Sequence, residues 1–154
     1  MTDLQLHEQL DETNRRLLRE MHADPRLSMS ELGRRVGLSA PAVSERVQRL
    51  QRSGVITGFR MDVDPAALGL PVAAYVRLRP APGQLDRIAE LAVATEQVSE
   101  CHRITGEDCF LIKLHAPTVA GLEDVLDLFL KHGQTVSSIV VTSPVPRRPL
   151  PIPD

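Results

Sequence analysis

The sequence is poor in aromatic residues and in cysteine. It contains no Trp, one Tyr and three Phe, and its only cysteines are Cys101 and Cys109. Two cysteines cannot build the disulfide framework of a small secreted domain, which indicates a reducing compartment. No run approaches the ~18 consecutive apolar residues of a membrane helix, and the acidic, polar start MTDLQLHEQLDET is unlike a signal peptide. We therefore expect a cytoplasmic protein without a membrane partner.

The strings that mark common enzyme classes are missing as well. The chain contains no G-x-S-x-G, H-E-x-x-H or G-x-G-x-x-G string and no phosphate-binding P-loop. Each of these spacings positions a nucleophile, a metal ion or a phosphate group for catalysis. We therefore expect a protein that is not an enzyme and that has no cofactor.

What the chain does have is a marked separation of charge. Residues 26–60 contain seven Arg and two Glu, which is a net charge of +5. The chain from Met61 onward contains eight Lys and Arg and twelve Asp and Glu, which is a net charge of −4. The basic segment is typical of a surface that binds nucleic acid, and the acidic remainder indicates a different task.

Helical patterns begin in the first part of the chain. Apolar residues recur with a helical period from Leu10 to Met21, and Asp24-Pro25 ends that pattern. Ser28 to Glu31 has the Ser-x-x-Glu form of a capping box and starts a second helix, for which Gly37 is a natural end. These signals predict two short helices.

A third helix is predicted from Ser39 to Arg52. Ser39 is a suitable N-cap, a proline falls in the first turn, and Val43, Val47 and Leu50 form one apolar stripe. Only three residues separate this helix from the second, which is the short turn of a helix-turn-helix. Val55 to Met61 then suggests two short extended segments bent at Gly58. Residues 1–61 are therefore predicted to form a winged helix-turn-helix that binds duplex DNA.

The third helix would serve as the recognition helix, because its apolar stripe leaves polar and basic side chains outside. The residues available to DNA are Ser39, Pro41, Ala42, Ser44, Glu45, Arg46, Gln48, Arg49 and Arg52. The N-terminal end of such a helix can approach base edges, and arginines can bind phosphates. The alternative is that the three arginines simply form a solvated helix face.

The second half of the chain predicts an α+β domain. After a linker over residues 62–71, which contains two Pro and one Gly, strand and helix patterns alternate in the order βαββαβ over residues 72–143. The predicted elements are a strand over 72–79, a helix over 84–95, strands over 98–105 and 108–115, a helix over 119–130 and a strand over 136–143. This order is that of a ferredoxin-like fold. The proline-rich tail, residues 144–154, should be extended or disordered.

The predicted hairpin is apolar on both faces. With an even turn at Gly106-Glu107, Cys101 lies opposite Ile112 and Glu100 opposite Lys113. Two helices cover only one face, so we expect a homodimer formed sheet to sheet. An RNA-binding sheet of the same order would need clustered aromatic residues, and this segment has only Tyr75, Phe110 and Phe129.

A metal or redox sensor is a further alternative, suggested by Cys101, His102, Cys109 and His115. The predicted pairing places the two cysteines on opposite faces and ~10 Å apart along the strand, which is too far for a disulfide. We expect no metal site.

The order of elements and four strings resemble the Lrp/AsnC family, the amino-acid-responsive feast/famine regulators of bacteria and archaea. The strings are LDETNRRLLREM, SMSELGRRVGLSAPAVSERVQRLQRSGVITGF, ECHRITGEDCFLIK and GQTVSSIV, which begin at Leu10, Ser28, Glu100 and Gly133. The resemblance covers nearly the whole chain. It implies a transcription regulator whose C-terminal domain forms dimers, which then assemble into an octamer.

The resemblance also implies an amino-acid effector bound between sensing domains of adjacent dimers. The matching positions are the hairpin residues His102, Arg103, Ile104, Thr105, Gly106, Glu107 and Asp108, together with Gly133, Gln134 and Thr135 of a turn and Ser137. An amino acid needs donors for its carboxylate and acceptors, such as Glu107 or Asp108, for its ammonium group. The alternative is a C-terminal domain that only oligomerises, without a small-molecule effector.

Overall fold

The computed structural model describes residues 10–153. This part of the chain divides into two compact units, each with its own hydrophobic core. One unit contains the described residues up to Met61 together with Val145–Pro153, and the other contains Asp62–Pro144.

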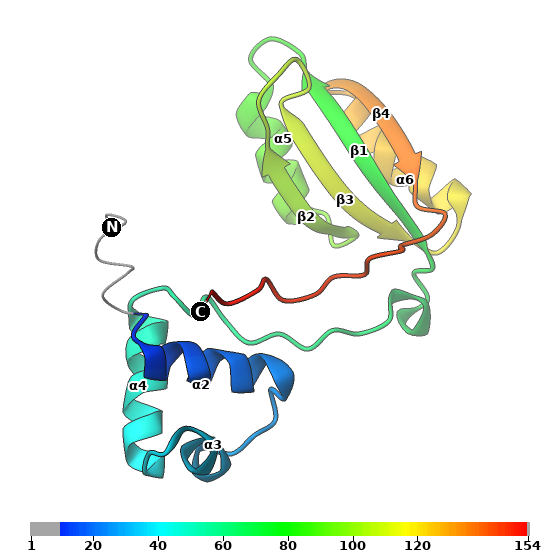
Figure 1. Cartoon of the computed structure of the whole chain (residues 1–154). Coiled ribbons are helices and arrows are strands. Elements are labelled where there is room, and N and C mark those ends of the chain that lie inside the picture. The colour runs from blue at the N-terminus through cyan, green and yellow to red at the C-terminus, as the bar shows by residue number, and fades with distance from the viewer. Residues whose placement is uncertain (1–9, 154) are drawn as a thin grey trace. The chain divides into compact units, whose positions relative to one another are not determined.

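Three helices build the first unit, shown in blue to cyan in Figure 1. They are α2 (Glu12–Ala23), α3 (Met29–Val36) and α4 (Ala40–Arg52). Ser28 and Ser39 each cap the helix that follows, because each side chain accepts a hydrogen bond from a backbone N–H in the first turn. Gly37 ends α3 in the left-handed conformation, with φ of 75°. The predicted helices and these three caps are confirmed.

The turn between α3 and α4 depends on a glycine that precedes it. The N–H of Leu38 donates to the carbonyl oxygen of Gly33 over 2.8 Å, and a Cβ atom at Gly33 would overlap the carbonyl oxygen of Leu38. The close approach lets both helices pack Leu32 and Val43 into the core under α2. The short turn therefore requires a residue without a side chain in α3.

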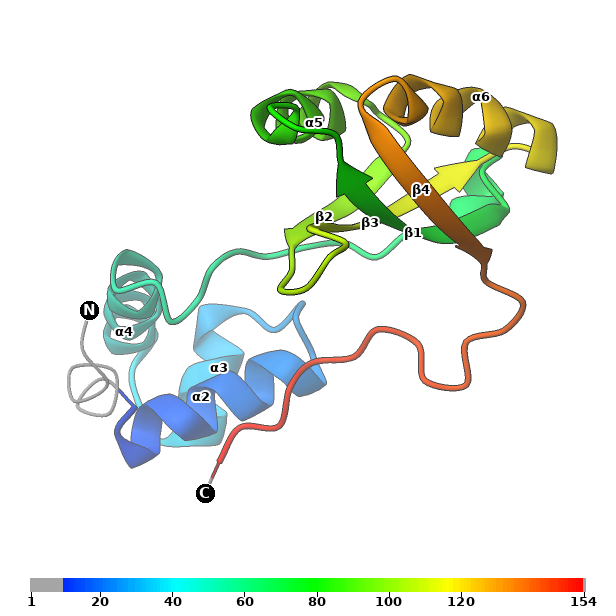
Figure 2. The same cartoon turned by 90° about the horizontal axis from the view of Figure 1, so that it is seen from above.

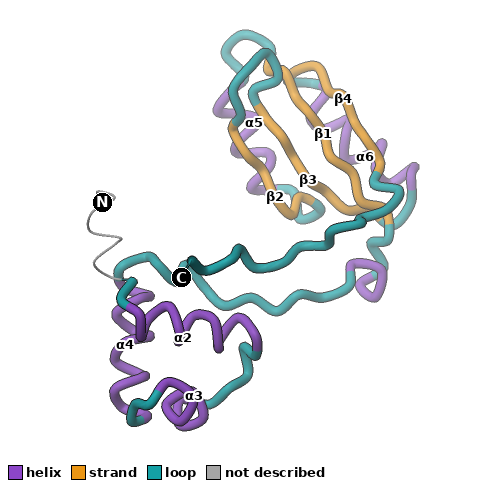
Figure 3. The backbone as a smooth tube through the Cα atoms, viewed as in Figure 1, coloured by secondary structure: helices purple, strands orange, loops and turns teal. Residues whose placement is uncertain are grey.

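The extended segments expected for a wing are not paired into strands. Residues 55–61 contain no strand, and Figure 3 shows this stretch as loop after α4. The N–H of Ile56 donates to the carbonyl oxygen of Leu50 over 3.0 Å, and its side chain packs against the core. Phe59 and Met61 are 58% and 85% exposed. Two strands need pairing partners, and the described part of a single chain supplies none for this segment.

The second unit is a four-stranded antiparallel sheet covered by two helices. Its elements are the short 3-10 helix η1 (Pro65–Leu68), β1 (Val72–Pro80), α5 (Leu85–Ala94), β2 (Val98–Arg103), β3 (Phe110–Ala116), α6 (Val119–Leu130) and β4 (Gly133–Ile139). The strand order is β2-β3-β1-β4. Figure 2 shows α5 and α6 on the same side of the sheet. The predicted ferredoxin-like fold is confirmed, and η1 was not predicted.

The core of this unit lies between the sheet and the two helices. Alternate strand residues such as Val76 and Ile112 pack there against Ile88 of α5 and Phe129 of α6. The intervening residues of β1 and β3 point to the face that no helix covers, which we call the open face. Its members on β1 and β3 are Ala73, Tyr75, Arg77, Arg79, Leu111, Lys113 and His115.

Two details of the sheet differ from the prediction. The pairs Glu100–Lys113 and Cys101–Ile112 are confirmed, but the register shifts between Val98 and Glu100. Strict alternation would place Val98 on the same face as Glu100, but the bulge turns it toward the helix-covered core. β4 also begins at Gly133 rather than Val136, so the expected turn over residues 133–135 is strand, paired with Pro80, Arg79 and Leu78 of β1.

The tail runs without helix or strand as far as Pro153, as expected from its prolines. Its end contacts the first unit, because the guanidinium of Arg19 in α2 donates to the carbonyl oxygen of Pro153 over 2.8 Å.

Candidate functional site

The exposed face of α4 follows from the residues that it buries. Val43, Val47 and Leu50 are inside the core, so the opposite side of the helix is open. Among the predicted DNA contacts, Ser39, Pro41, Glu45, Gln48, Arg49 and Arg52 are exposed, and Ala42, Ser44 and Arg46 are partly exposed. The helix therefore presents a continuous polar and basic surface from its N-cap to its last residue.

Arg46 differs from the other arginines of α4 because its side chain is held inside the unit. Its guanidinium lies 2.7 Å from the carboxylate of Asp11, the N-cap of α2, and donates to the side-chain oxygen of Asn14 over 3.0 Å. Only 28% of the Arg46 side chain is exposed. Arg46 therefore fixes α4 against the start of α2, a role that the helical pattern alone did not indicate.

The contacts with Arg46 and Asn14 lower the pKa of the Asp11 carboxyl. Burial by itself raises its pKa, but the hydrogen bonds from Arg46 and the backbone of Asn14, with the positive charges of Arg46 and Arg49, outweigh burial and hold the pKa below its ordinary value. The carboxylate form is thus the one that the folded unit favours.

Arg49 and Arg52 extend away from the core. Arg49 pairs with Glu45 one turn earlier over 3.0 Å, and both side chains are more than half exposed. Arg52 has no hydrogen bond or ion pair to any of residues 10–153. An exposed pair is weak in water, so both guanidinium groups are available to phosphates.

The second group of predicted residues lies at the hairpin between β2 and β3. His102 and Arg103 end β2, Gly106 has φ of 112°, and Asp108 is the most shielded of the predicted turn residues. Arg103 stacks over the ring of Phe110, with its guanidinium carbon 5.6 Å from the ring centroid. The N–H of Ile104 donates to the carbonyl oxygen of Cys109 over 2.9 Å and closes the turn. His102 lies 3.5 Å from Glu100 on the open face.

Two arginines of β1 that were not predicted as site residues hold this turn. Arg79 pairs with Glu107 and lies 3.7 Å from Asp108, while Arg77 lies 3.7 Å from the other oxygen of Asp108. Both hairpin acids therefore form solvent-exposed ion pairs with β1, which are weak in water. The two-residue alternation of β1, which places Arg77 and Arg79 on one face, was a signal that could have found them.

The remaining predicted residues lie along β4. Gly133 fits against β1 without a side chain, since a Cβ atom there would overlap the carbonyl oxygen of Arg79. Gln134 pairs with Arg79 in the sheet, on the open face. Thr135 and Ser137 pair with Leu78 and Val76, whose side chains point to the helix-covered side. Within one chain, the structure brings only Gln134 of this group onto the face of Arg79 and the hairpin acids.

Among the described residues, the cysteine and histidine side chains do not form a cluster that could bind a metal ion. Cys101 and Cys109 are free thiols, and burial raises the pKa of Cys101. Residues 10–153 contain no group of three His, Cys, Asp or Glu side chains that could hold a metal ion. In the same range, no helix is both long enough and apolar enough to cross a membrane.

Comparison with known proteins follows the same division of the chain. Residues 10–57 match the family described as winged helix-turn-helix DNA-binding, and residues 73–150 match the Lrp/AsnC ligand binding domain. The chain is 33% identical to the HTH-type transcriptional regulator LrpC of Bacillus subtilis over 85% of this chain and 91% of that protein. It is 36% identical to LrpA of Mycobacterium tuberculosis over 79% of this chain and 81% of that protein.

Solved structures of regulators match the same fold. The feast or famine regulatory protein Rv3291c of M. tuberculosis, complexed with L-methionine, superposes with a TM-score of 0.86 at 33% identity, covering 94% of this chain and 99% of that one. Both halves of the chain match family models, and the relatives align over most of their length. This chain therefore belongs to the Lrp/AsnC family of transcription regulators.

Proposed function

We propose that this regulator binds duplex DNA by placing α4 in the major groove, with the N-terminal end of the helix against base edges and Arg49 and Arg52 on phosphates. The observation that carries the proposal is the exposed face of α4, on which Ser44, Gln48 and Arg52 follow one another while the opposite stripe is buried. Because Arg46 is engaged by Asp11 and Asn14, we assign it to the support of α4.

The test compares a duplex selected by this protein from a random pool with a scrambled duplex of equal length. Arg52→Ala should weaken binding to both duplexes alike and lower the slope of log K against log salt by about one per bound copy. Ser44→Ala should weaken only the selected duplex, by about 5- to 150-fold if that side chain binds a base (~1 to 3 kcal/mol). Arg87→Ala on α5, in the other unit, is the control, and equal losses for all three variants would contradict the proposal.

The binding species is proposed to be a homodimer that joins the open faces of two sheets. Tyr75 and Val136 are 40% and 50% exposed on this face. Phe59 and Met61, at the end of the first unit, are 58% and 85% exposed on a segment that has no strand partner among the described residues. A second copy would cover these apolar groups. Two copies of α4 would then meet half-sites about 34 to 36 Å apart, or a multiple of this, on a near-palindromic operator.

Light scattering on the full chain tests the assembly. We expect the mass of at least two copies at micromolar concentration, and of eight if dimers assemble into an octamer. Val136→Asp should reduce the mass, because it places a carboxylate in the proposed interface, while Val93→Asp on the helix side should not. A monomer at this concentration would contradict the dimer.

We further propose that the hairpin over residues 102–108, with Gly133, Gln134, Thr135 and Ser137 of β4, contributes to a site for an amino-acid effector between sensing domains. A relative of the same fold was solved with L-methionine. The hairpin offers carboxylates for an ammonium group, and Arg77 and Arg79 next to them offer donors for a carboxylate. Thr135 and Ser137 lie on the other face of the sheet, so they would require the adjacent dimer.

A thermal-shift panel of the common amino acids tests the effector proposal, because a ligand at 100 times its Kd stabilises by ~2.7 kcal/mol. One or more amino acids should raise the unfolding midpoint, and Asp108→Asn should reduce that rise while Glu90→Gln on α5 leaves it unchanged. If no amino acid shifts the midpoint, the C-terminal domain serves assembly alone.

A further inference from the structure

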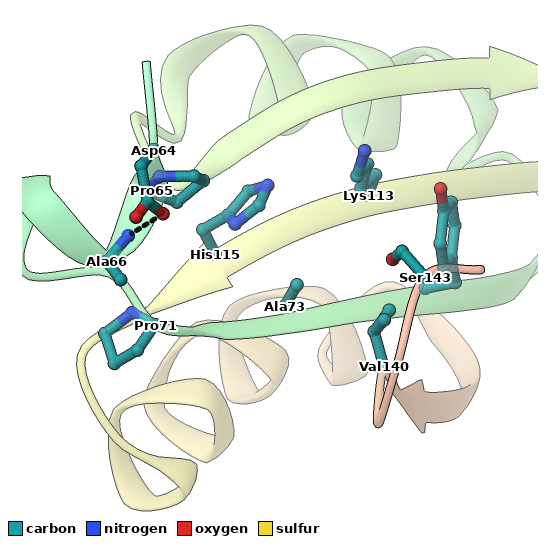
Figure 4. A pocket seen from close by; sticks show the side chains of 10 residues that line it. Asp64, Pro65, Ala66, Pro71, Ala73, Lys113, His115, Val140 and Ser143 are labelled. Atoms are coloured by element: carbon teal, nitrogen blue, oxygen red, sulfur yellow. Dashed lines mark hydrogen bonds between the residues drawn. The ribbon is translucent and has the colours of Figure 1, made fainter. Parts of the chain in front are cut away.

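The chain leaves the sheet after β4 and continues as a proline-rich tail. The N–H of Val140 donates to the carbonyl oxygen of Ala73 over 2.8 Å, and Figure 4 shows Val140 and Ser143 near the sheet before the tail begins. Residues 144–153 contain five Pro, and they make no backbone–backbone hydrogen bond within residues 10–153. Proline lacks an N–H and fixes φ, which favours an extended, polyproline-like chain. The tail is therefore a stiff segment whose surface is open.

The far end of the tail is attached to the DNA-binding unit. Val145–Pro153 group with the three helices and not with the sheet, and the guanidinium of Arg19 in α2 donates to the carbonyl oxygen of Pro153 over 2.8 Å. Ile152 is partly shielded from solvent, whereas Leu150 is 83% exposed. A group held by a short tether acts at a high effective concentration. The middle of the tail is thus kept near a ligand that the helices of this unit bind.

Arg147 and Arg148 occupy the middle of the tail, between Pro146 and Pro149. Both are exposed, and neither forms a hydrogen bond or an ion pair with any of residues 10–153. Acidic partners are abundant in the unit from which the tail departs, since residues 62–144 contain eleven Asp and Glu and six Lys and Arg, a net charge of −5. Because the two guanidinium groups pair with none of these acids, they are available to an anion outside the chain.

The minor groove of duplex DNA suits this combination of an extended backbone and adjacent arginines. The groove is roughly 6 Å wide, so it admits a single extended chain but not a helix. Where the base pairs are A·T, the groove is narrow and strongly negative, and it attracts an inserted arginine. A G·C pair projects the N2 amino group of guanine into the same space. A stiff polyproline segment also loses little conformational entropy on binding.

We propose that Arg147 and Arg148 bind the minor groove of the DNA that flanks the half-site of α4. The proposal rests on the proposed DNA binding by α4 and extends it to base pairs that α4 does not reach. Each bound copy then recognises a major-groove half-site through α4 and an A·T-rich flank through its tail. The competing partner is a protein with an aromatic groove for proline-rich segments. The contact between Pro153 and α2 favours DNA, because it keeps both arginines with the unit that binds DNA.

Binding of the full chain to three duplexes tests the proposal. All three contain the half-sites that the unaltered protein selects, and their flanks consist of A·T, G·C or inosine·C pairs. Inosine lacks the N2 amino group of guanine and retains its major-groove edge, so the last two flanks differ only in the groups that they present in the minor groove. The unaltered chain should bind the A·T and inosine·C flanks about tenfold more tightly than the G·C flank.

Removal of the two tail arginines should abolish this preference. The double variant Arg147→Gln, Arg148→Gln should bind all three duplexes about as weakly as the unaltered chain binds the G·C flank. On the A·T flank, its slope of log K against log salt should fall by up to about two per bound copy. The matched control is Arg87→Gln, Lys131→Gln, which removes the same charge from exposed positions of the second unit. The control should keep both the affinity and the preference.

The variant Arg52→Ala separates a failure of this proposal from a failure of the proposed role of α4. It should weaken binding to all three duplexes and keep the flank preference. If Arg52→Ala weakens binding but the tail variant keeps the flank preference, α4 binds DNA and the minor-groove proposal is overturned. If Arg52→Ala binds like the unaltered chain while the tail variant loses the preference, the role of Arg52 is wrong and the tail contact stands.

Three other results would overturn the tail proposal. Equal binding of the unaltered chain to all three flanks would leave the tail to a protein partner. An equal loss on all three flanks in the tail variant would place the arginines on phosphates alone. A lower mass of the tail variant in light scattering, together with weaker binding to every duplex, would mean that the tail serves assembly.

Discussion

The guanidinium Nε of Arg79 lies 3.7 Å from Oδ1 of Asp108, and the same guanidinium pairs with Glu107. Arg79 belongs to β1, a central strand, and the two acids belong to the turn between β2 and β3. The backbone of Arg79 is itself held close to Gly133 at the start of β4. Arg79 therefore connects the two segments that were predicted to contact an effector.

Replacing Arg79 should loosen the hairpin without unfolding the sheet. In Arg79→Gln, the amides of residues 104–109 should exchange with solvent several times faster. The midpoint of urea unfolding should change little, since exposed ion pairs contribute only about 0.2 to 1 kcal/mol. Hydrogen exchange followed by mass spectrometry measures the first effect. Arg87→Gln, which removes an exposed pair with Glu90 on α5, should leave the hairpin unchanged; equal exchange in both variants would refute the role of Arg79.

Arg46 should matter for stability more than the other arginines of α4. Arg46→Ala removes the contacts to Asp11 and Asn14 and should lower the free energy of unfolding by about 1 kcal/mol. Arg52→Ala should change it by less than about 0.5 kcal/mol, because no contact within the described chain is lost. Urea denaturation of the first unit's helices, followed by circular dichroism, measures both values. A larger loss in Arg52→Ala than in Arg46→Ala would show that the assignment is wrong.

The contribution of Arg46 should depend on pH. The pKa of Asp11 is lowered in the folded chain from its ordinary value of 3.8. Stability from a lowered carboxyl pKa is fully present above the unfolded value and is lost as pH falls through the folded value. The difference in unfolding free energy between the unaltered chain and Arg46→Ala should therefore be constant above about pH 5 and shrink below about pH 4. An Asp11→Asn background should remove this dependence, and a pH-independent difference would contradict the pairing.

The glycine of α3 should be intolerant of a side chain. Gly33→Ala would drive a Cβ atom into the carbonyl oxygen of Leu38, so we expect a loss of several kcal/mol in stability and of DNA binding at physiological temperature. Gly58→Ala is a fair control, because no atom lies within 4 Å of a Cβ there. Thermal unfolding measures the stability of both variants, and a gel-shift titration measures their DNA binding. Equal stability and equal DNA affinity of the two variants would mean that the turn can open without loss of stability.

The sequence by itself determined the elements that depend on neighbouring residues. The ends of α3 and the start of α4 are set by contacts within four residues, made by Ser28, Gly37 and Ser39. The exposed face of α4 follows from the buried stripe of Val43, Val47 and Leu50. The βαββαβ order and the Glu100–Lys113 register also followed from short-range periodicity and one turn. These features can be predicted without knowing where distant parts of the chain lie.

Only the tertiary structure decided the relationships between distant residues. Arg46 meets Asp11 across 35 positions, and Arg79 meets Glu107 across 28, so no local pattern could join them. The bulge before Glu100 and the start of β4 at Gly133 were set by packing against neighbouring strands, which strict alternation ignores.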